Sequence, residues 1–253
     1  MEKMPAAIGW QWIKQGFALF RKQPAELSTL FLSYMFLMMV ITVIPVVGQL
    51  LPLVLVPVFS MAFMQACVQV EKGQRVYPNL LLTGFRSPAF ATLVKLGLLY
   101  VLAATAAIGL SALVDGGVFW NVMTGSAKVD AKTVQGSGVS IAMLLAALLY
   151  TPAAMAFWFA APLVAWQGMG LFKSMFYSFH AVRRAGRPFL LYGLGWAGIG
   201  VVLPLLLSTL LGQLTGSPVL MMMVLLPLSI VLTVVMYCSF YPTYTTLFGK
   251  PPQ

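Results

Sequence analysis

The chain has 253 residues, of which 60% are hydrophobic and 8% are charged, and it carries a formal net charge of +10. Soluble domains contain about 25% charged residues, so the composition excludes a water-soluble globular protein and indicates an integral membrane protein. The basic residues are confined to short segments beside apolar runs, which is typical of a membrane surface and not of a nucleic-acid-binding face. We therefore expect no nucleic-acid partner.

The N-terminal segment MEKMPAAIGWQWIKQGFALFRK is basic and amphipathic, and we predict an interfacial helix over 5–24. It lacks the continuous apolar core and the small-residue cleavage site of a signal peptide, so we expect no cleavable leader. Trp10 and Trp12 are residue types that prefer the membrane–water interface.

Crossing a bilayer as a helix requires about 20 mostly apolar residues. Six segments meet this requirement: 27–45, 49–70, 89–114, 139–166, 189–211 and 218–241. Short uncharged links join the first pair and the last pair, and a polar loop at 115–138 joins the middle pair. We therefore predict an all-α integral membrane protein, a single membrane domain over 1–253, with six transmembrane helices arranged as three hairpins.

The basic residues lie almost entirely on one side of this arrangement. Only Lys128 and Lys132, in the 115–138 loop, fall on the other side. Cytoplasmic loops carry the excess of Lys and Arg, so we predict that both termini are cytoplasmic and that 115–138 is periplasmic. The thirteen residues on the predicted cytoplasmic side are Lys3, Lys14, Arg21, Lys22, Lys72, Arg75, Arg86, Lys95, Lys173, Arg183, Arg184, Arg187 and Lys250.

Each predicted hairpin follows a basic segment that ends in proline, namely FRKQP, FRSP and VRRAGRP. The third segment belongs to a predicted interfacial helix over 168–187. On a helical projection Phe172 and Phe176 lie on an apolar arc, while His180 and Arg184 lie on a basic arc. The cations of these segments are candidate ligands for an anionic lipid head group: Lys173, His180, Arg183, Arg184, Arg187, Arg21, Lys22 and Arg86. The alternative is a solvated basic face without a dedicated ligand.

Catalytic chemistry is not indicated. None of the five carboxylates lies in the middle of a predicted span, and no acid or second histidine accompanies His180. Phosphate-binding glycine loops, zinc-peptidase motifs and nucleophile elbows are also absent from the sequence. We therefore expect no enzyme and no cofactor. Mid-membrane ionisable groups, which ion-coupled transporters use, are missing as well.

Four sulfur-containing residues form one further candidate site, for a metal ion. Met61, Met64 and Cys67 follow one another at three-residue spacing on the second span, and Cys238 lies near the end of the last. Thioethers and thiolates suit Cu(I), although methionine is also an ordinary packing residue in apolar helices. Prolines inside the spans, such as Pro152 and Pro162, similarly indicate either a hinge beside a cavity or simple helix curvature.

Three stretches carry a resemblance to a known family: WFAAPLVAWQGMGLFKSMFYSFHAVRRAGRPFLLYGLG, GWQWIKQGFALFRKQP and SFYPTYTTLFG. They resemble a family of six-span bacterial inner-membrane proteins over nearly the full chain, and more loosely YciC-like proteins and the membrane-anchor domain of glycerophosphodiester phosphodiesterases. The resemblance implies the topology and an inner-membrane location, and it transfers no catalytic site.

Together these patterns favour a non-enzymatic inner-membrane protein that binds anionic phospholipid and acts as a subunit or organiser of a membrane or envelope complex. Its expected partners are phospholipid and another membrane protein or a second copy of the chain. Two alternatives remain: a transporter or channel for an apolar or amphipathic solute such as a lipid, and Cu(I) handling.

Overall fold

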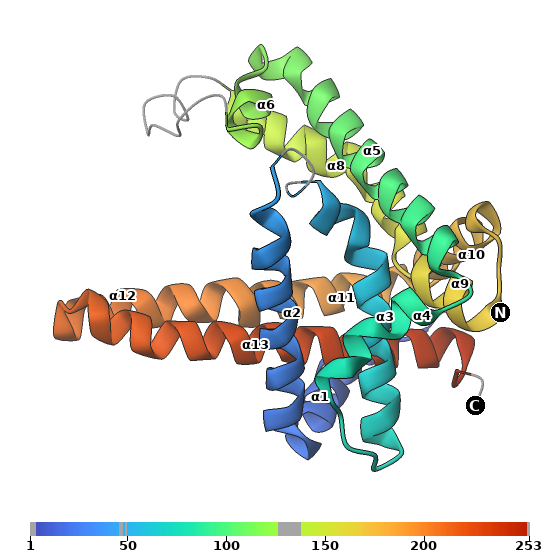
Figure 1. Ribbon diagram of the computed structural model, residues 1–253. Helices are drawn as coiled ribbons and strands as arrows, with labels where there is room; N and C mark the ends of the chain where they lie inside the picture. The colour runs from blue at the N-terminus through green and yellow to red at the C-terminus, as the bar shows by residue number, and fades with distance from the viewer. Residues whose placement is uncertain (1–3, 46–47, 49, 126–137, 252–253) are drawn as a thin grey trace.

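The computed structural model describes residues 4–45, 48, 50–125 and 138–251, and the regular elements in these ranges are helices (Figure 1). Half of the predicted 115–138 loop, residues 126–137 with Lys128 and Lys132, lies outside the described residues, and so does Lys3. In chain order the elements are α1 (Ala7–Lys22), α2 (Pro24–Thr42), α3 (Leu51–Glu71), the 3₁₀-helix η1 (Pro78–Leu82), α4 (Thr83–Arg86), α5 (Phe90–Asp115), α6 (Val118–Met123), α8 (Val139–Phe157), α9 (Ala160–Gln167), α10 (Leu171–Arg184), α11 (Gly186–Ala197), the π-helix η2 (Gly198–Val202), α12 (Leu203–Thr215) and α13 (Pro218–Phe248).

Six helical stretches are long and apolar enough to cross a membrane, which confirms the predicted six-helix membrane fold. They pair as α2 with α3, α5 with α8–α9, and α11–α12 with α13. In Figure 1 the third hairpin crosses the first and projects to the left, and the α5–α8 hairpin rises from the right toward the top. We call the side where the described Lys and Arg residues gather, at the starts of α2, α5 and α11, the basic end.

Several helix boundaries follow from proline and glycine. Pro52 lies in the first turn of α3, where the missing N–H has no helical partner to lose. Gly168 and Gly216 end α9 and α12 in the left-handed conformation, which favours glycine. Pro152 lies inside α8, and Pro204 follows η2 within the continuous span Gly186–Thr215.

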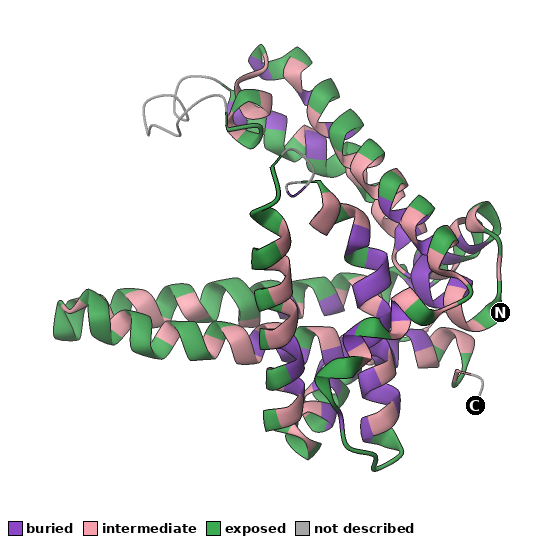
Figure 2. Cartoon of the chain, in the orientation of Figure 1, coloured by how far each residue is buried: buried purple, intermediate pink, exposed green. Residues whose placement is uncertain are grey.

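The core is concentrated at the basic end. Figure 2 shows buried residues gathered where α1, α3, α9 and α13 meet, while α12 and the adjoining half of α13 are mostly exposed. The most buried span is α3, with Val58, Ala62 and Ala66 fully enclosed. Since apolar side chains exposed here face lipid in a membrane protein, the exposed half of the third hairpin needs no protein cover.

Helix α1 packs one face against α11 and α13, and its other face is exposed. Trp12 and Ile13 are each only 1% exposed, and the Trp12 indole N–H donates a hydrogen bond to Thr246 Oγ1 at 3.0 Å. Gly9 and Gly16 allow this approach, because a Cβ at Gly16 would come within 2.5 Å of the Ser239 Cβ. Trp12 therefore packs into the protein core, whereas Trp10 is exposed.

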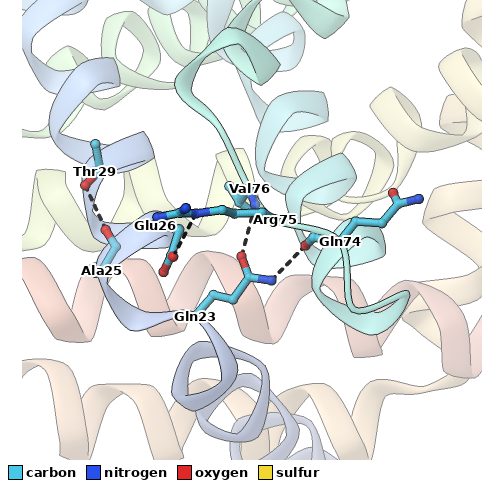
Figure 3. Close-up of polar contacts among 7 residues, drawn as sticks. All are labelled: Gln23, Ala25, Glu26, Thr29, Gln74, Arg75 and Val76. Carbon is cyan, nitrogen blue, oxygen red and sulfur yellow. Dashed lines mark hydrogen bonds and ion pairs between the residues drawn. The ribbon is translucent and has the colours of Figure 1, made fainter.

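A side-chain clamp holds the start of α2 to the segment that follows α3 (Figure 3). The Gln23 amide donates to the Gln74 carbonyl at 2.7 Å, and its carbonyl oxygen accepts from the Val76 N–H at 3.0 Å. Arg75 pairs with Glu26, in the first turn of α2, at 3.3 Å. These contacts fix the basic end of the first hairpin.

Candidate functional site

The candidate site is an aromatic cavity of about 540 Å³ between the three hairpins. Five elements contribute to its wall: α3, α5, the α8–α9 junction, α11 and α13. More than half of the lining residues are aromatic and none is charged, so the cavity suits an uncharged, apolar molecule. The aromatic lining residues are Phe63, Tyr100, Tyr150, Phe157, Trp158, Phe189, Tyr192, Trp196, Tyr237 and Phe240.

The fourth span is interrupted beside this cavity. Helix α8 ends at Phe157 and α9 begins at Ala160. Pro162 explains the break, because it has no N–H for the Trp158 carbonyl four residues earlier and its ring collides with that carbonyl. Pro162 therefore marks a discontinuity at the cavity wall rather than gentle curvature.

Side chains from other elements bind the backbone groups that the break leaves free. The Ser178 hydroxyl, on α10, donates to the Met155 carbonyl at 2.8 Å and accepts from the Phe159 N–H at 2.9 Å. The Tyr100 hydroxyl, on α5, donates to the Phe157 carbonyl at 3.0 Å. Backbone polar groups inside a membrane must be satisfied within the protein, so these two side chains stabilise the break.

Most of the other polar groups in the wall also have partners. Ser239, on α13, interacts with both the Tyr192 hydroxyl at 2.7 Å and the Trp196 indole N–H at 3.2 Å. The Ser60 hydroxyl donates to the Pro57 carbonyl. Trp158 differs, because its Nε1 is buried and has no hydrogen-bond partner within the described part of the chain. The Trp158 side chain thus lines the cavity, but its N–H is enclosed by protein and does not open into the cavity.

The predicted head-group residues are exposed, and five of the eight follow one another along α10 and the start of α11. Helix α10 turns Ser174, Ser178 and Val182 inward. Its outer face carries Phe172 and Phe176, which are 75% and 61% exposed. The exposed basic residues on this stretch are Lys173, His180, Arg183, Arg184 and Arg187. Apolar rings beside cations are typical of a membrane-surface helix.

The other three candidates lie on different elements. Arg21 and Lys22 end α1, and Arg86 ends α4, all of them exposed. Lys22 also borders a small polar pocket of about 180 Å³ that includes Glu71 and Tyr241. The eight predicted residues therefore do not form one cluster.

The four predicted sulfur ligands, Met61, Met64, Cys67 and Cys238, are all buried. Cys67 on α3 and Cys238 on α13 lie next to each other in the core. The described residues include no group of three or more His, Cys, Asp or Glu side chains that could hold a metal ion.

Sequence reasoning missed Trp158 and Tyr100, which line the cavity, and Ser178, which binds the backbone of the break beside it. One signal was present: the run FWFAAP places three aromatic residues three to five positions before a proline inside a span. The partners of that run come from other spans, and sequence spacing alone did not identify them.

The chain is similar to a protein of Burkholderia thailandensis named as a probable inner membrane protein. The two are 38% identical over 252 residues, which cover 98% of this chain and 93% of the relative. No protein-family model and no solved structure matches the chain.

Proposed function

Because the chain belongs to the family of this bacterial inner-membrane protein, we propose that it is a non-enzymatic lipid-binding protein of that membrane. It holds an acyl chain of a phospholipid in the aromatic cavity and the anionic head group at the basic end. The observation that carries this proposal is the uncharged aromatic cavity beside an interrupted span.

The size and lining of the cavity support an acyl chain. Its volume of about 540 Å³ falls within the range of roughly 300–1,000 Å³ that is common for small-molecule sites. Burying hydrocarbon against aromatic walls is favourable, whereas a charged group there would lose its hydration without a partner. The head group therefore stays outside the cavity.

The basic end supplies a place for that head group. Arg187 lies in the first turn of α11 and is exposed, while Phe189, two residues later, lines the cavity. Two residues span roughly 3 Å along a helix axis, so the basic surface and the cavity begin at the same end of α11. Guanidinium groups bind phosphate through charge-assisted hydrogen bonds, and clustered cations attract anionic lipids.

Native mass spectrometry of the protein, extracted gently from its own membrane, tests the proposal. We expect the wild-type chain to retain a phospholipid. Gly193→Leu fills the cavity, because Gly193 lines it and a Cβ there meets open space; this variant should lose the lipid. Gly198→Leu is the matched control, since its Cβ also meets open space but Gly198 does not line the cavity. A wild-type protein that carries no lipid would overturn the proposal.

A second variant separates the head-group site from the cavity. Replacing Arg183, Arg184 and Arg187 with Ala should reduce retention of anionic phospholipid more than retention of zwitterionic phospholipid, because only the former gains from the cations. The same experiment detects a co-purifying membrane protein or a second copy of the chain, as expected for a subunit or organiser of a complex.

Transport of the lipid is a second candidate function, and the interrupted α8–α9 span favours it. Discontinuous helices form the substrate sites of many transporters. Reconstituted vesicles containing a fluorescent phospholipid test this candidate: the wild-type protein should accelerate its redistribution between leaflets, and Gly193→Leu should not.

A further inference from the structure

A second, polar pocket of about 180 Å³ lies at the basic end and shares no lining residue with the aromatic cavity. Its wall comes from α1, from the last residue of α3 and from residues 241–245 of α13. The volume is below the roughly 300–1,000 Å³ of typical small-molecule sites. The pocket therefore suits one polar group of a ligand and not an entire lipid.

Two side chains of opposite charge line this pocket without pairing with each other. Lys22, at the end of α1, has no ion pair within the described part of the chain. The Glu71 carboxylate uses one oxygen, Oε2, both for the Tyr241 hydroxyl at 2.9 Å and for the Lys250 ammonium at 3.4 Å. Its other oxygen, Oε1, has no partner among the described residues.

Both charged groups can be reached by a ligand. Lys22 is exposed, and 34% of the Glu71 side chain is accessible. The pocket therefore offers an accessible cation and an accessible carboxylate oxygen a short distance apart.

We propose that this pocket binds a zwitterion with a primary ammonium and a phosphate, namely the phosphoethanolamine group of an aminophospholipid or of a soluble phosphodiester. The ammonium donates to Glu71 Oε1, and the phosphate pairs with the Lys22 ammonium. This site is separate from the proposed site for an acyl chain and an anionic head group, and the inference does not rest on that proposal.

The charges of the wall favour a zwitterion. An anion would gain from Lys22 but would meet the Glu71 carboxylate, and a simple cation would meet the opposite combination. The Lys250 ion pair does not remove the need of Glu71 for a cation, because the Lys250 side chain is 78% exposed and exposed ion pairs contribute little.

The ammonium is expected to be primary. A primary ammonium donates charge-assisted hydrogen bonds to a carboxylate, whereas the quaternary ammonium of choline has no N–H. Sites for quaternary ammonium groups instead use cages of several aromatic rings. Tyr241 is the one aromatic residue that lines this pocket, and its hydroxyl already binds Glu71.

The location suits a lipid as the source of this group. Glu71 is the last residue of the span α3, and Lys22 precedes the span α2 by two residues. Phospholipid head groups lie at the level where spans leave the hydrocarbon. A soluble zwitterion would reach the same side chains from the aqueous side.

Native mass spectrometry of the full-length protein, titrated with phosphatidylethanolamine or phosphatidylcholine of equal chain length, tests the inference. We expect the wild-type chain to bind phosphatidylethanolamine roughly three- to tenfold more tightly, the effect of a charge-assisted hydrogen bond reduced by solvent exposure. Glu71→Gln keeps the shape and an acceptor for Tyr241 but removes the charge, so it should abolish the preference. Glu26→Gln is the control, because Glu26 pairs with Arg75 and does not line the pocket.

A second pair of variants tests the phosphate contact. Lys22→Gln should weaken the binding of phosphatidylethanolamine. Lys14→Gln should not, because Lys14 is exposed on the same helix but lies outside the pocket lining.

Glycerophosphoethanolamine, which carries the same head group without acyl chains, distinguishes the two sources. Competition with the lipid would show that the pocket takes the soluble group, and no competition would assign it to the lipid. Each titration is repeated in Gly193→Leu, in which the aromatic cavity is filled, so that a failure of the proposed function is seen separately. Equal binding of the two lipids to the wild-type chain, or a preference that survives in Glu71→Gln, would overturn the inference.

Discussion

The phenolic hydroxyl of Tyr241 donates a hydrogen bond to a carboxylate oxygen of Glu71, 2.9 Å away. Tyr241 belongs to α13 and Glu71 ends α3. The Lys250 ammonium lies 3.4 Å from the same carboxylate oxygen. One carboxylate thus joins the first hairpin, the last helix and the C-terminal segment at the basic end.

Tyr241→Phe should lower the stability of the protein by roughly 1–2 kcal/mol, because a hydrogen bond to a charged acceptor contributes about that much. Thermal unfolding in detergent, followed by circular dichroism, measures the change. Lys250→Met is the control and should have a smaller effect, because the Lys250 side chain is 78% exposed and exposed ion pairs stabilise little. Equal losses in the two variants would contradict this assignment.

Gly16→Ala should separate α1 from α13, because the added Cβ would come within 2.5 Å of the Ser239 Cβ. Forced overlap of this kind costs typically 1–3 kcal/mol. Since Ser239 also binds Tyr192 and Trp196 in the cavity wall, the variant should lose bound lipid as well as stability. Melting temperature and lipid retention are the two measurements.

Gly186→Ala is the control for this change, because a Cβ at Gly186 meets open space. It should keep both the melting temperature and the lipid of the wild-type chain. If Gly16→Ala behaves in the same way as Gly186→Ala, the close approach of α1 and α13 is not needed for either property.

Ser178→Ala should destabilise the α8–α9 break by roughly 2 kcal/mol, since it leaves the Met155 carbonyl and the Phe159 N–H without their partner in an apolar setting. Ser174→Ala is a matched control on the same buried face of α10. The Ser174 hydroxyl donates only to Leu171 within its own helix at 2.7 Å, so its removal should cost less. Comparable unfolding temperatures for the two variants would argue against a bridging role for Ser178.

Reporter fusions should place both termini in the cytoplasm, because thirteen of the fifteen Lys and Arg residues lie on the predicted cytoplasmic side. A green fluorescent protein attached after residue 253 should fluoresce, whereas alkaline phosphatase at the same position should be inactive. Active alkaline phosphatase at that position would contradict the predicted cytoplasmic location of the C-terminus.

The six spans could be predicted from the sequence because membrane crossing depends on local composition, which a contiguous run of residues reveals. The packing of α1 could not be predicted in the same way. Trp12 is a residue type that suits both the membrane interface and a protein core, and the distinction depends on Gly16 meeting Ser239, more than two hundred residues later. Amphipathic periodicity identifies an apolar face but does not say what covers it.

The cavity could not be predicted from the sequence, for a related reason. Trp158 and Pro162 are neighbours in the chain, and the break between them is a local effect of proline. The wall, however, also takes Tyr100 from α5, Tyr192 from α11 and Phe240 from α13, whose proximity depends on how the hairpins cross. The exposed basic face of α10 could be predicted because amphipathic periodicity, like membrane crossing, is a local pattern.

The hydrogen bonds of Ser178 have a consequence for how α10 can work. Many basic amphipathic helices are reversible sensors, which bind to an anionic surface and detach when its charge falls. Detachment of α10 would withdraw Ser178 from the Met155 carbonyl and the Phe159 N–H and leave both unsolvated. Arg183 and Arg184 are thus carried by a helix that stays packed in the bundle, and the anionic lipid of the proposed function would have to diffuse to them. A change in membrane charge would then alter how long a lipid stays, and not where the helix lies.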